Sequence, residues 1–153
     1  MGYIFTIGYE GASLVSFIGT LEREGIATLL DVRRDPWSRR PEFRKRGLEE
    51  ALAVAGIAYR NEPRLGVPRD IRERFRDGAA PEIFAAWYAA EVLAKNTDLL
   101  RELSESVKST PTALLCYEAD PARCHRALLA LELARLTGLP VRHLAPATAA
   151  EQP

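Results

Sequence analysis

This chain has few cysteines, no long apolar run and no excess of charge of either sign, and each of these absences argues against a class of protein. Two cysteines in 153 residues are too few for a disulfide-stapled scaffold. No apolar run approaches the roughly 20 residues that a membrane-spanning helix requires. Basic and acidic residues balance at 21 each, so net charge gives the whole molecule no preference for nucleic acid or anionic membrane. With 47% hydrophobic and 27% charged residues, the composition is that of one ordinary globular domain.

The first residues, MGYIFTIGYEG, enter a strand pattern at once. They lack the basic segment, apolar stretch and small-residue cleavage site of a secretory signal. We therefore expect a cytoplasmic protein without a membrane partner. In a reducing compartment Cys116 and Cys124 are expected to be thiols unless they are redox-active.

Short apolar runs bounded by turn residues alternate with stretches of helical period, which is typical of βαβ units around a mostly parallel sheet. Five strands are predicted: Tyr3–Ile7, Thr28–Val32, Ala58–Asn61, Thr112–Cys116 and Val141–Leu144. Continuously apolar strands suit burial on both faces. The predicted fold class is α/β, a single three-layer Rossmann-like domain over residues 1–144 with helices flanking the sheet. A flexible tail is expected over residues 145–153.

Capping residues and periodicity predict the helices. The first helix is predicted to begin after Ser13 and to end at Gly25, and the second to end at Gly56. Two more helices are predicted over Pro81–Leu93 and Thr97–Val107. The aromatic residues Phe84, Trp87 and Tyr88 are expected in the core. The last helix is predicted from Asp120 as cap and Pro121 as first residue to Gly138, with an apolar stripe of Leu128, Leu129, Leu131, Leu133 and Leu136.

In open parallel sheets, ligands bind beyond the carboxyl ends of the strands, where loops and helix N-termini line a crevice. This rule predicts one polar, anion-seeking site made of segments that are distant in sequence. The catalytic candidates are Cys116, Glu118, Cys124 and His125, and the anion-binding candidates are Arg33, Arg39 and Arg126. The expected supporting residues are Thr6, Gly8, Tyr9, Asp31 and Ser38.

Cys124 is predicted to lie in the first turn of the last helix. There the helix dipole and a neighbouring His or Arg favour the thiolate, and free N–H groups favour an anion. Structural roles stay open as alternatives. Cys116 suits core packing, Cys124 a half-buried helical position and His125 a helix surface, whereas Glu118 and Asp31 suit ion pairs with Arg33 or Arg126.

Metal and cofactor motifs are missing. Cys116, Cys124, His125 and the distant His143 are the soft ligands, and Cys-x7-Cys-His is not a familiar zinc spacing, so we predict no metal. The spacing also differs from Cys-x-x-Cys, although a redox pair stays open. Cys116 and Arg123 form Cys-x6-Arg, which matches the Cys-x5-Arg of tyrosine phosphatases in topology only. Without a Walker loop or Gly-x-Gly-x-x-Gly, no ATP or NAD cofactor is expected.

Two segments that read as loops are locally basic: residues 33–46 carry a charge of +5 and residues 60–76 a charge of +3. They suggest a non-catalytic module in which arginines bind phosphates and Trp37, Phe43 and Phe75 stack on bases. The alternative is a solvated face that balances acidic helices. A homodimer is compatible with the apolar content.

Motifs along most of the chain resemble those of the family called domain of unknown function 488. They are Thr6-Ile-Gly-Tyr-Glu-Gly11, Asp31-Val-Arg33, Pro36-Trp-Ser-Arg39, Leu65-Gly66 and Leu115-Cys-Tyr-Glu118 leading to Cys124-His-Arg126. The resemblance implies a bacterial or archaeal α/β domain with a shared polar site, and it supplies no established reaction. Our leading hypothesis is a cysteine-dependent enzyme acting on a phosphorylated or otherwise anionic substrate, including a nucleotide or nucleic acid.

Overall fold

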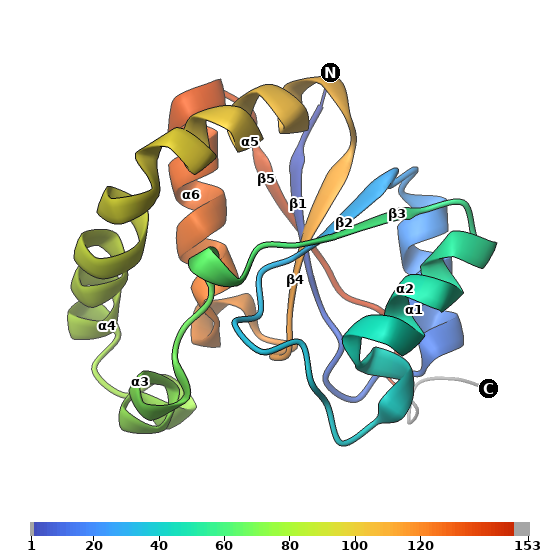
Figure 1. Ribbon diagram of the computed structural model, residues 1–153, viewed down its shortest axis with the longest axis horizontal. Helices are drawn as coiled ribbons and strands as arrows, with labels where there is room; N and C mark the ends of the chain where they lie inside the picture. The colour runs from blue at the N-terminus through green and yellow to red at the C-terminus, as the bar shows by residue number, and fades with distance from the viewer. Residues whose placement is uncertain (1, 149–153) are drawn as a thin grey trace.

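The computed structural model describes residues 2–148, and a parallel sheet forms its centre (Figure 1). In this part of the chain the sheet has five strands in the order β3-β2-β4-β1-β5, and all neighbouring pairs are parallel. The strands are β1 (Ile4–Gly8), β2 (Thr28–Asp31), β3 (Ala58–Asn61), β4 (Thr112–Cys116) and β5 (Val141–Leu144). The predicted α/β fold class and its parallel sheet are confirmed.

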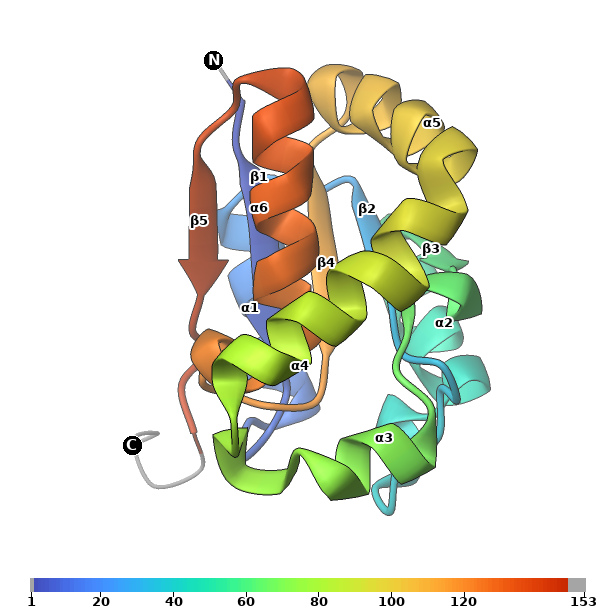
Figure 2. The ribbon, with the colours of Figure 1, turned by 90° about the vertical axis from the view of Figure 1, so that its left-hand side faces the viewer.

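Helices cover both faces of the sheet (Figure 1, Figure 2). One face carries α1 (Leu14–Arg23) and α2 (Lys45–Val54). The other carries α4 (Pro81–Tyr88), α5 (Thr97–Ser109) and α6 (His125–Thr137). The short helix α3 (Arg69–Arg74) lies beyond the carboxyl edge of the sheet. Loops and helix starts therefore gather at that edge.

Alternating side chains of the strands build two apolar layers. Ile4 of β1 belongs to the cluster that includes residues of α5 and α6, whereas Phe5 and Ile7 belong to the cluster that includes residues of α1 and α2. All five residues of β1 and of β4 are buried. Burial on both faces is expected for the central strands of a parallel sheet and explains their uninterrupted apolar sequence.

Capping residues mark the start of α1 and the end of α6, as predicted. Ser13 accepts a hydrogen bond from the Ser16 N–H at the start of α1. Gly138 adopts a left-handed conformation (φ 78°) directly after α6, which a residue with a Cβ rarely does. Single 3-10 turns lie at Pro41–Phe43, Pro63–Leu65, Arg76–Gly78, Ala94–Asn96 and Pro121–Arg123, and a π-helical turn, Ala89–Leu93, continues α4.

The loop prediction for residues 60–76 is wrong over α3. Pro68 directly precedes this helix, Asp70 places a negative charge in its first turn, and Arg69 pairs with Glu73 one turn later at 3.2 Å. These local effects offset the polar composition that suggests a loop. β1 begins and ends one residue later than predicted, and β2 ends one residue earlier.

The predicted start of the last helix is also wrong. Asp120 caps only a 3-10 turn, Pro121–Arg123, by accepting a hydrogen bond from the Ala122 N–H. Cys124 then has an extended backbone (φ −133°, ψ 144°) and is the residue before α6, not part of its first turn. Of the five leucines in the predicted stripe, Leu131 and Leu136 are exposed because they lie off the buried face of the helix.

The chain after β5 runs beside α1. Ala12 and Thr148 form an isolated antiparallel bridge, and the Ser16 hydroxyl donates a hydrogen bond to the Ala147 carbonyl. Residues 149–153 of the predicted flexible tail lie outside the described residues. From residue 2 to residue 148, no helix combines the length and apolar character needed to cross a membrane.

Candidate functional site

A cavity of about 900 Å³ opens at the carboxyl edge of the sheet. Its walls come from the loops after β1, β2 and β4, from α3 and the turn after it, and from the start of α6. Among the described residues, eight arginines and five carboxylates line it, so the cavity is locally cationic although the chain is neutral. A site at this edge is where parallel α/β sheets bind ligands.

Both cysteines face this cavity. Cys116 is the last residue of β4 and Cys124 directly precedes α6, and their side chains are 2% and 5% exposed. The two sulfurs are paired as a disulfide, and the Cα atoms are 7.2 Å apart. The strand end and the helix start therefore bring together two sulfurs that are separated by eight positions in the sequence.

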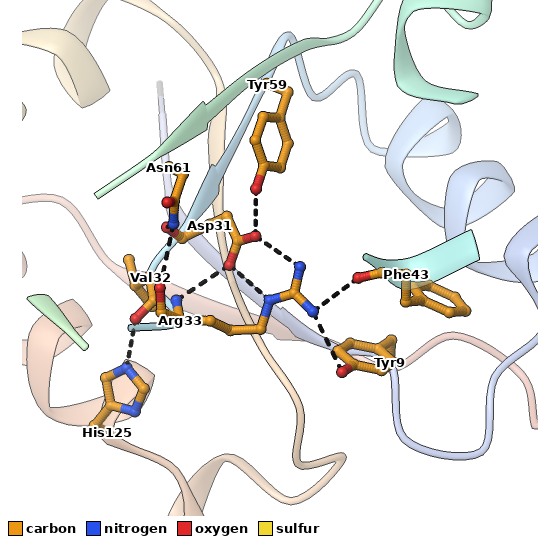
Figure 3. Close-up of polar contacts among 8 residues, drawn as sticks. All are labelled: Tyr9, Asp31, Val32, Arg33, Phe43, Tyr59, Asn61 and His125. Carbon is orange, nitrogen blue, oxygen red and sulfur yellow. Dashed lines mark hydrogen bonds and ion pairs between the residues drawn. The ribbon is translucent and has the colours of Figure 1, made fainter. Parts of the chain in front are cut away.

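His125, the first residue of α6, follows Cys124 directly and contributes a neutral imidazole. Its Nε2 atom is 3.0 Å from the Val32 carbonyl oxygen, which can only accept, so Nε2 carries the proton (Figure 3). The unprotonated Nδ1 lies 3.8 Å from Cys124 Sγ. Burial lowers the pKa of His125 to about 4, and the hydrogen bond to Val32 opposes this only partly. The ring is buried, which overturns the alternative of a helix-surface histidine.

Arg126 is fully buried and is not among the residues that line the cavity. It donates to the Thr6 hydroxyl (3.2 Å), to the carbonyls of Glu118 and Ala119, and to Cys116 Sγ (3.4 Å). Between residues 2 and 148 it has no carboxylate within ion-pair distance. Burial lowers its pKa to about 10, and the charges of Glu118 and Asp120 oppose that shift. Among the atoms that Arg126 contacts, the Cys116 sulfur is therefore the one that can become an anion once the disulfide is reduced.

Arg33 is held within the loop structure by an ion pair (Figure 3). Its guanidinium donates to both carboxylate oxygens of Asp31, at 2.9 and 2.7 Å, and also to the Phe43 carbonyl and the Tyr9 hydroxyl. Burial opposes its charge, yet Asp31 and Tyr9 raise its pKa above the ordinary value. Arg33 and Asp31 therefore form the structural pair that was the alternative reading, and Arg33 has little capacity left for a ligand.

Tyr59 and Asn61 of β3 complete this network. The Tyr59 hydroxyl donates to Asp31 Oδ2 at 2.6 Å, and Asn61 donates to the backbone carbonyls of Asp31 and Arg33. Burial and the negative charge of Asp31 raise the pKa of Tyr59 above its ordinary value of 10.0. The network fixes the end of β2, which is where the cavity begins.

Four exposed arginines of the cavity wall make no ion pair and no side-chain hydrogen bond among the described residues. They are Arg34, Arg39, Arg72 and Arg76. Arg39 is one of the named anion-binding candidates, whereas Arg34, Arg72 and Arg76 were predicted only as members of the basic segments 33–46 and 60–76. Arg72 lines the same cavity as Glu118 and His125, and its positive charge acts to lower the pKa of both.

Glu118 combines a carboxylate with partial burial. Its Oε2 atom lies 3.5 Å from Cys116 Sγ. Burial raises its pKa above the ordinary value, and the charges of Arg126 and Arg72 oppose this. A carboxyl group of this kind keeps its proton to a higher pH than an exposed one, as a proton donor requires.

The remaining predicted residues have supporting positions. Gly8 is packed so tightly that a Cβ would collide with the Glu118 carbonyl. Thr6 lies between Arg126 and His143, whose Nδ1 is 2.6 Å from the Thr6 hydroxyl oxygen. Ser38 is buried and accepts from the Arg40 N–H at 3.1 Å.

Phe43 and Tyr9 stack within the core, with ring centroids 4.5 Å apart. Phe43 is 0% exposed, so its predicted role in stacking on bases is wrong. Its ring also meets Phe17 edge to face, which explains the burial. Trp37 is 60% exposed and lies at the cavity wall, so it is free to contact a ligand.

Comparison with curated proteins and with solved structures gives no match. The family resemblance seen in the sequence motifs has independent support from a family model. Residues 13–133 match the model described as "Domain of unknown function DUF488". This match spans most of the chain and contains both cysteines, His125 and all four unpaired arginines of the cavity wall. The chain belongs to the DUF488 family.

Proposed function

We propose that this protein is a cysteine-dependent enzyme that acts on a phosphorylated or otherwise anionic substrate. The observation that carries the proposal is the convergence, in one cavity of about 900 Å³, of Cys116, Cys124, His125 and Glu118 with four unpaired arginines. Substrate cavities of enzymes commonly have a volume of about 300–1,000 Å³. The reduced form of the protein is the reactive form, which agrees with the proposed cytoplasmic location.

Arg34, Arg39, Arg72 and Arg76 are the proposed anion-binding residues. They come from the loop after β2 and from the region of α3, which form facing parts of the cavity wall. A guanidinium group without a protein carboxylate is free to bind phosphate through two parallel N–H donors. Arg33 and Arg126 support the site from within and do not touch the substrate.

Cys116 is the proposed nucleophile, because the positive charge of Arg126 lies 3.4 Å from its sulfur and favours the thiolate. The thiolate attacks an electrophilic atom of the bound anion. Glu118, 3.5 Å from the same sulfur, donates a proton to the leaving group. Cys124 and His125 form the second thiol–imidazole pair, in which Nδ1 can accept a hydrogen bond from the thiol.

Alkylation tests this function directly. The reduced protein is treated with iodoacetamide at neutral pH, with and without inorganic phosphate, and mass spectrometry locates the modified cysteine. We expect Cys116 to react faster than free cysteine and phosphate to protect it. The function is refuted if both thiols react no faster than free cysteine and no phosphorylated compound protects them. A panel of phosphorylated compounds then identifies substrates, with Cys116→Ser as the inactive control.

A phosphate- and nucleic-acid-binding module is the second candidate. Exposed Trp37, with Arg44 over its ring at 5.0 Å from the centroid, is the observation that favours it. This candidate predicts salt-dependent retention of a single-stranded oligonucleotide, lost in Trp37→Ala, and normal thiol reactivity. An enzyme with a small substrate shows the opposite pattern.

A further inference from the structure

Three donor atoms converge beside the cavity. Cys116 Sγ, Cys124 Sγ and His125 Nδ1 all lie within 4.8 Å of one another, and all three residues are buried. We propose that in the reduced protein these atoms bind one Zn²⁺ ion. The inference goes beyond the proposed function, because it assigns a metal ion to the protein. The ion would bond to the Cys116 sulfur, which is also the proposed nucleophile.

The spacing of the donors suits a tetrahedral ion. Bond lengths of about 2.3 Å for Zn–S and about 2.0 Å for Zn–N place neighbouring ligand atoms about 3.5–3.8 Å apart. Cys124 Sγ and His125 Nδ1 are already 3.8 Å apart. The cysteine Cα atoms are 7.2 Å apart, whereas disulfide-bonded cysteines usually have a separation of about 4.4–6.8 Å. The backbone thus leaves room for an ion between the sulfurs once they are reduced.

The surroundings of the donors are those of a metal site. His125 donates its other ring N–H to the Val32 carbonyl at 3.0 Å, which fixes the ring and leaves Nδ1 as the ligand (Figure 3). Metal-ligating histidines characteristically have such a partner. Arg126 donates to Cys116 Sγ at 3.4 Å, and a donor of this kind stabilises a thiolate ligand.

Charge favours an ion at this position. Two buried thiolates carry two negative charges, and the single charge of Arg126 balances only one of them. A divalent cation neutralises the thiolates, and Arg126 then balances the carboxylate of Glu118, whose Oε2 lies 3.5 Å from Cys116 Sγ. Thiolate and imidazole donors select Zn²⁺ over Mg²⁺ and Ca²⁺. Glu118 or a cavity ligand is placed to fill the fourth position.

Formation of the metal site from the disulfide takes two steps, reduction and then Zn²⁺ binding. A phosphine reductant supplies two electrons to the disulfide and is oxidised to the phosphine oxide with oxygen from water, and the two sulfurs take up two protons. Zn²⁺ then displaces those two protons and bonds to both sulfurs and to Nδ1. The disulfide form has no sulfur anion to offer and is expected not to bind the ion.

Cobalt titration tests the site without an activity assay. The reduced full-length protein, freed of phosphine, is titrated anaerobically with Co²⁺. We expect one equivalent to produce thiolate-to-metal charge-transfer bands and the visible bands of tetrahedral cobalt, which Zn²⁺ then removes. Cys116→Ser and Cys124→Ser are expected to lose the charge-transfer intensity. His125→Gln is expected to weaken binding by more than about tenfold.

His143→Gln is the matched control, because it removes the other histidine, which is exposed and outside the donor cluster. It should leave the titration unchanged. The inference is overturned if wild-type protein with two free thiols gives no charge-transfer band, or if His143→Gln weakens binding as much as His125→Gln. Ordinary alkylation rates of both thiols, without protection by any phosphorylated compound, would refute the proposed function alone if Co²⁺ binding stays intact. Fast, protected alkylation without Co²⁺ binding would refute the metal site alone.

Discussion

Replacing Arg126 by glutamine removes a buried positive charge that lies 3.4 Å from Cys116 Sγ. Two unit charges about 4 Å apart interact by about 4 kcal/mol at an effective dielectric constant of about 20. The thiolate of Cys116 is therefore expected to lose up to about 4 kcal/mol of stabilisation, and each 1.4 kcal/mol changes its population by about tenfold. The alkylation rate at neutral pH should fall by at least about tenfold and by up to about a thousandfold.

The rate is measured with iodoacetamide in a Cys124→Ser background, where Cys116 is the single thiol. The substitution also leaves carbonyl acceptors of Glu118 and Ala119 without their donor, so unfolding free energy is expected to fall by about 1–3 kcal/mol. Circular dichroism and thermal melting establish that the variant is folded. Arg126→Lys keeps the charge and should retain most of the rate. Equal rates in wild type and a folded Arg126→Gln variant would refute the electrostatic role of Arg126.

Three further predictions concern the network, the strand end and the cavity. Tyr59→Phe removes the hydrogen bond to Asp31 and should lower the unfolding free energy in urea at neutral pH by about 1 kcal/mol. Because the pKa of Tyr59 is raised in the folded protein, wild-type stability should fall as the pH rises above 10, and this fall should be smaller in Tyr59→Phe. Gly8→Ala places a Cβ against a backbone carbonyl, so its melting temperature should drop, and an unchanged melting curve would contradict the packing. Arg72→Gln should weaken phosphate protection of Cys116 several-fold, whereas Arg101→Gln, on α5 and outside the cavity, should not.

The strands were predictable mainly where burial in the sheet requires a recognisable run of apolar residues. β4 has the predicted bounds because its uninterrupted apolar run is required for burial in the middle of a parallel sheet. The edge strands β3 and β5 also have the predicted bounds, although their polar residues leave most of each strand unburied. That the candidate residues meet at one edge was also predictable, because chain topology alone places the ends of β1, β2 and β4 there. Cys116, Glu118, Cys124 and His125 line one cavity there, as that rule requires.

The division of labour among the arginines was not predictable from sequence. A charge count treats Arg33, Arg126 and Arg72 alike, yet the first is paired with Asp31, the second is buried against the Cys116 sulfur and the third makes no ion pair at the cavity wall. Pairing depends on side-chain directions and burial, which sequence spacing does not encode. The proposed Zn²⁺ site illustrates the same limit, because a spacing rule for zinc does not cover ligands that a strand end and a helix start bring together.

Arg126 links the chemistry of the reduced protein to its fold. A buried cation is strongly destabilising unless an anion or several acceptors surround it. In the disulfide form Arg126 has only carbonyl, hydroxyl and uncharged sulfur acceptors, and no carboxylate at ion-pair distance among residues 2–148. Reduction lets Cys116 become the missing anion. We therefore expect the charge of Arg126 to favour the reduced pair over the disulfide, since whatever binds one redox form more favourably shifts the equilibrium toward it. The proposed nucleophilic attack and the proposed Zn²⁺ binding both need that reduced form, and the same guanidinium would stabilise the thiolate in either case.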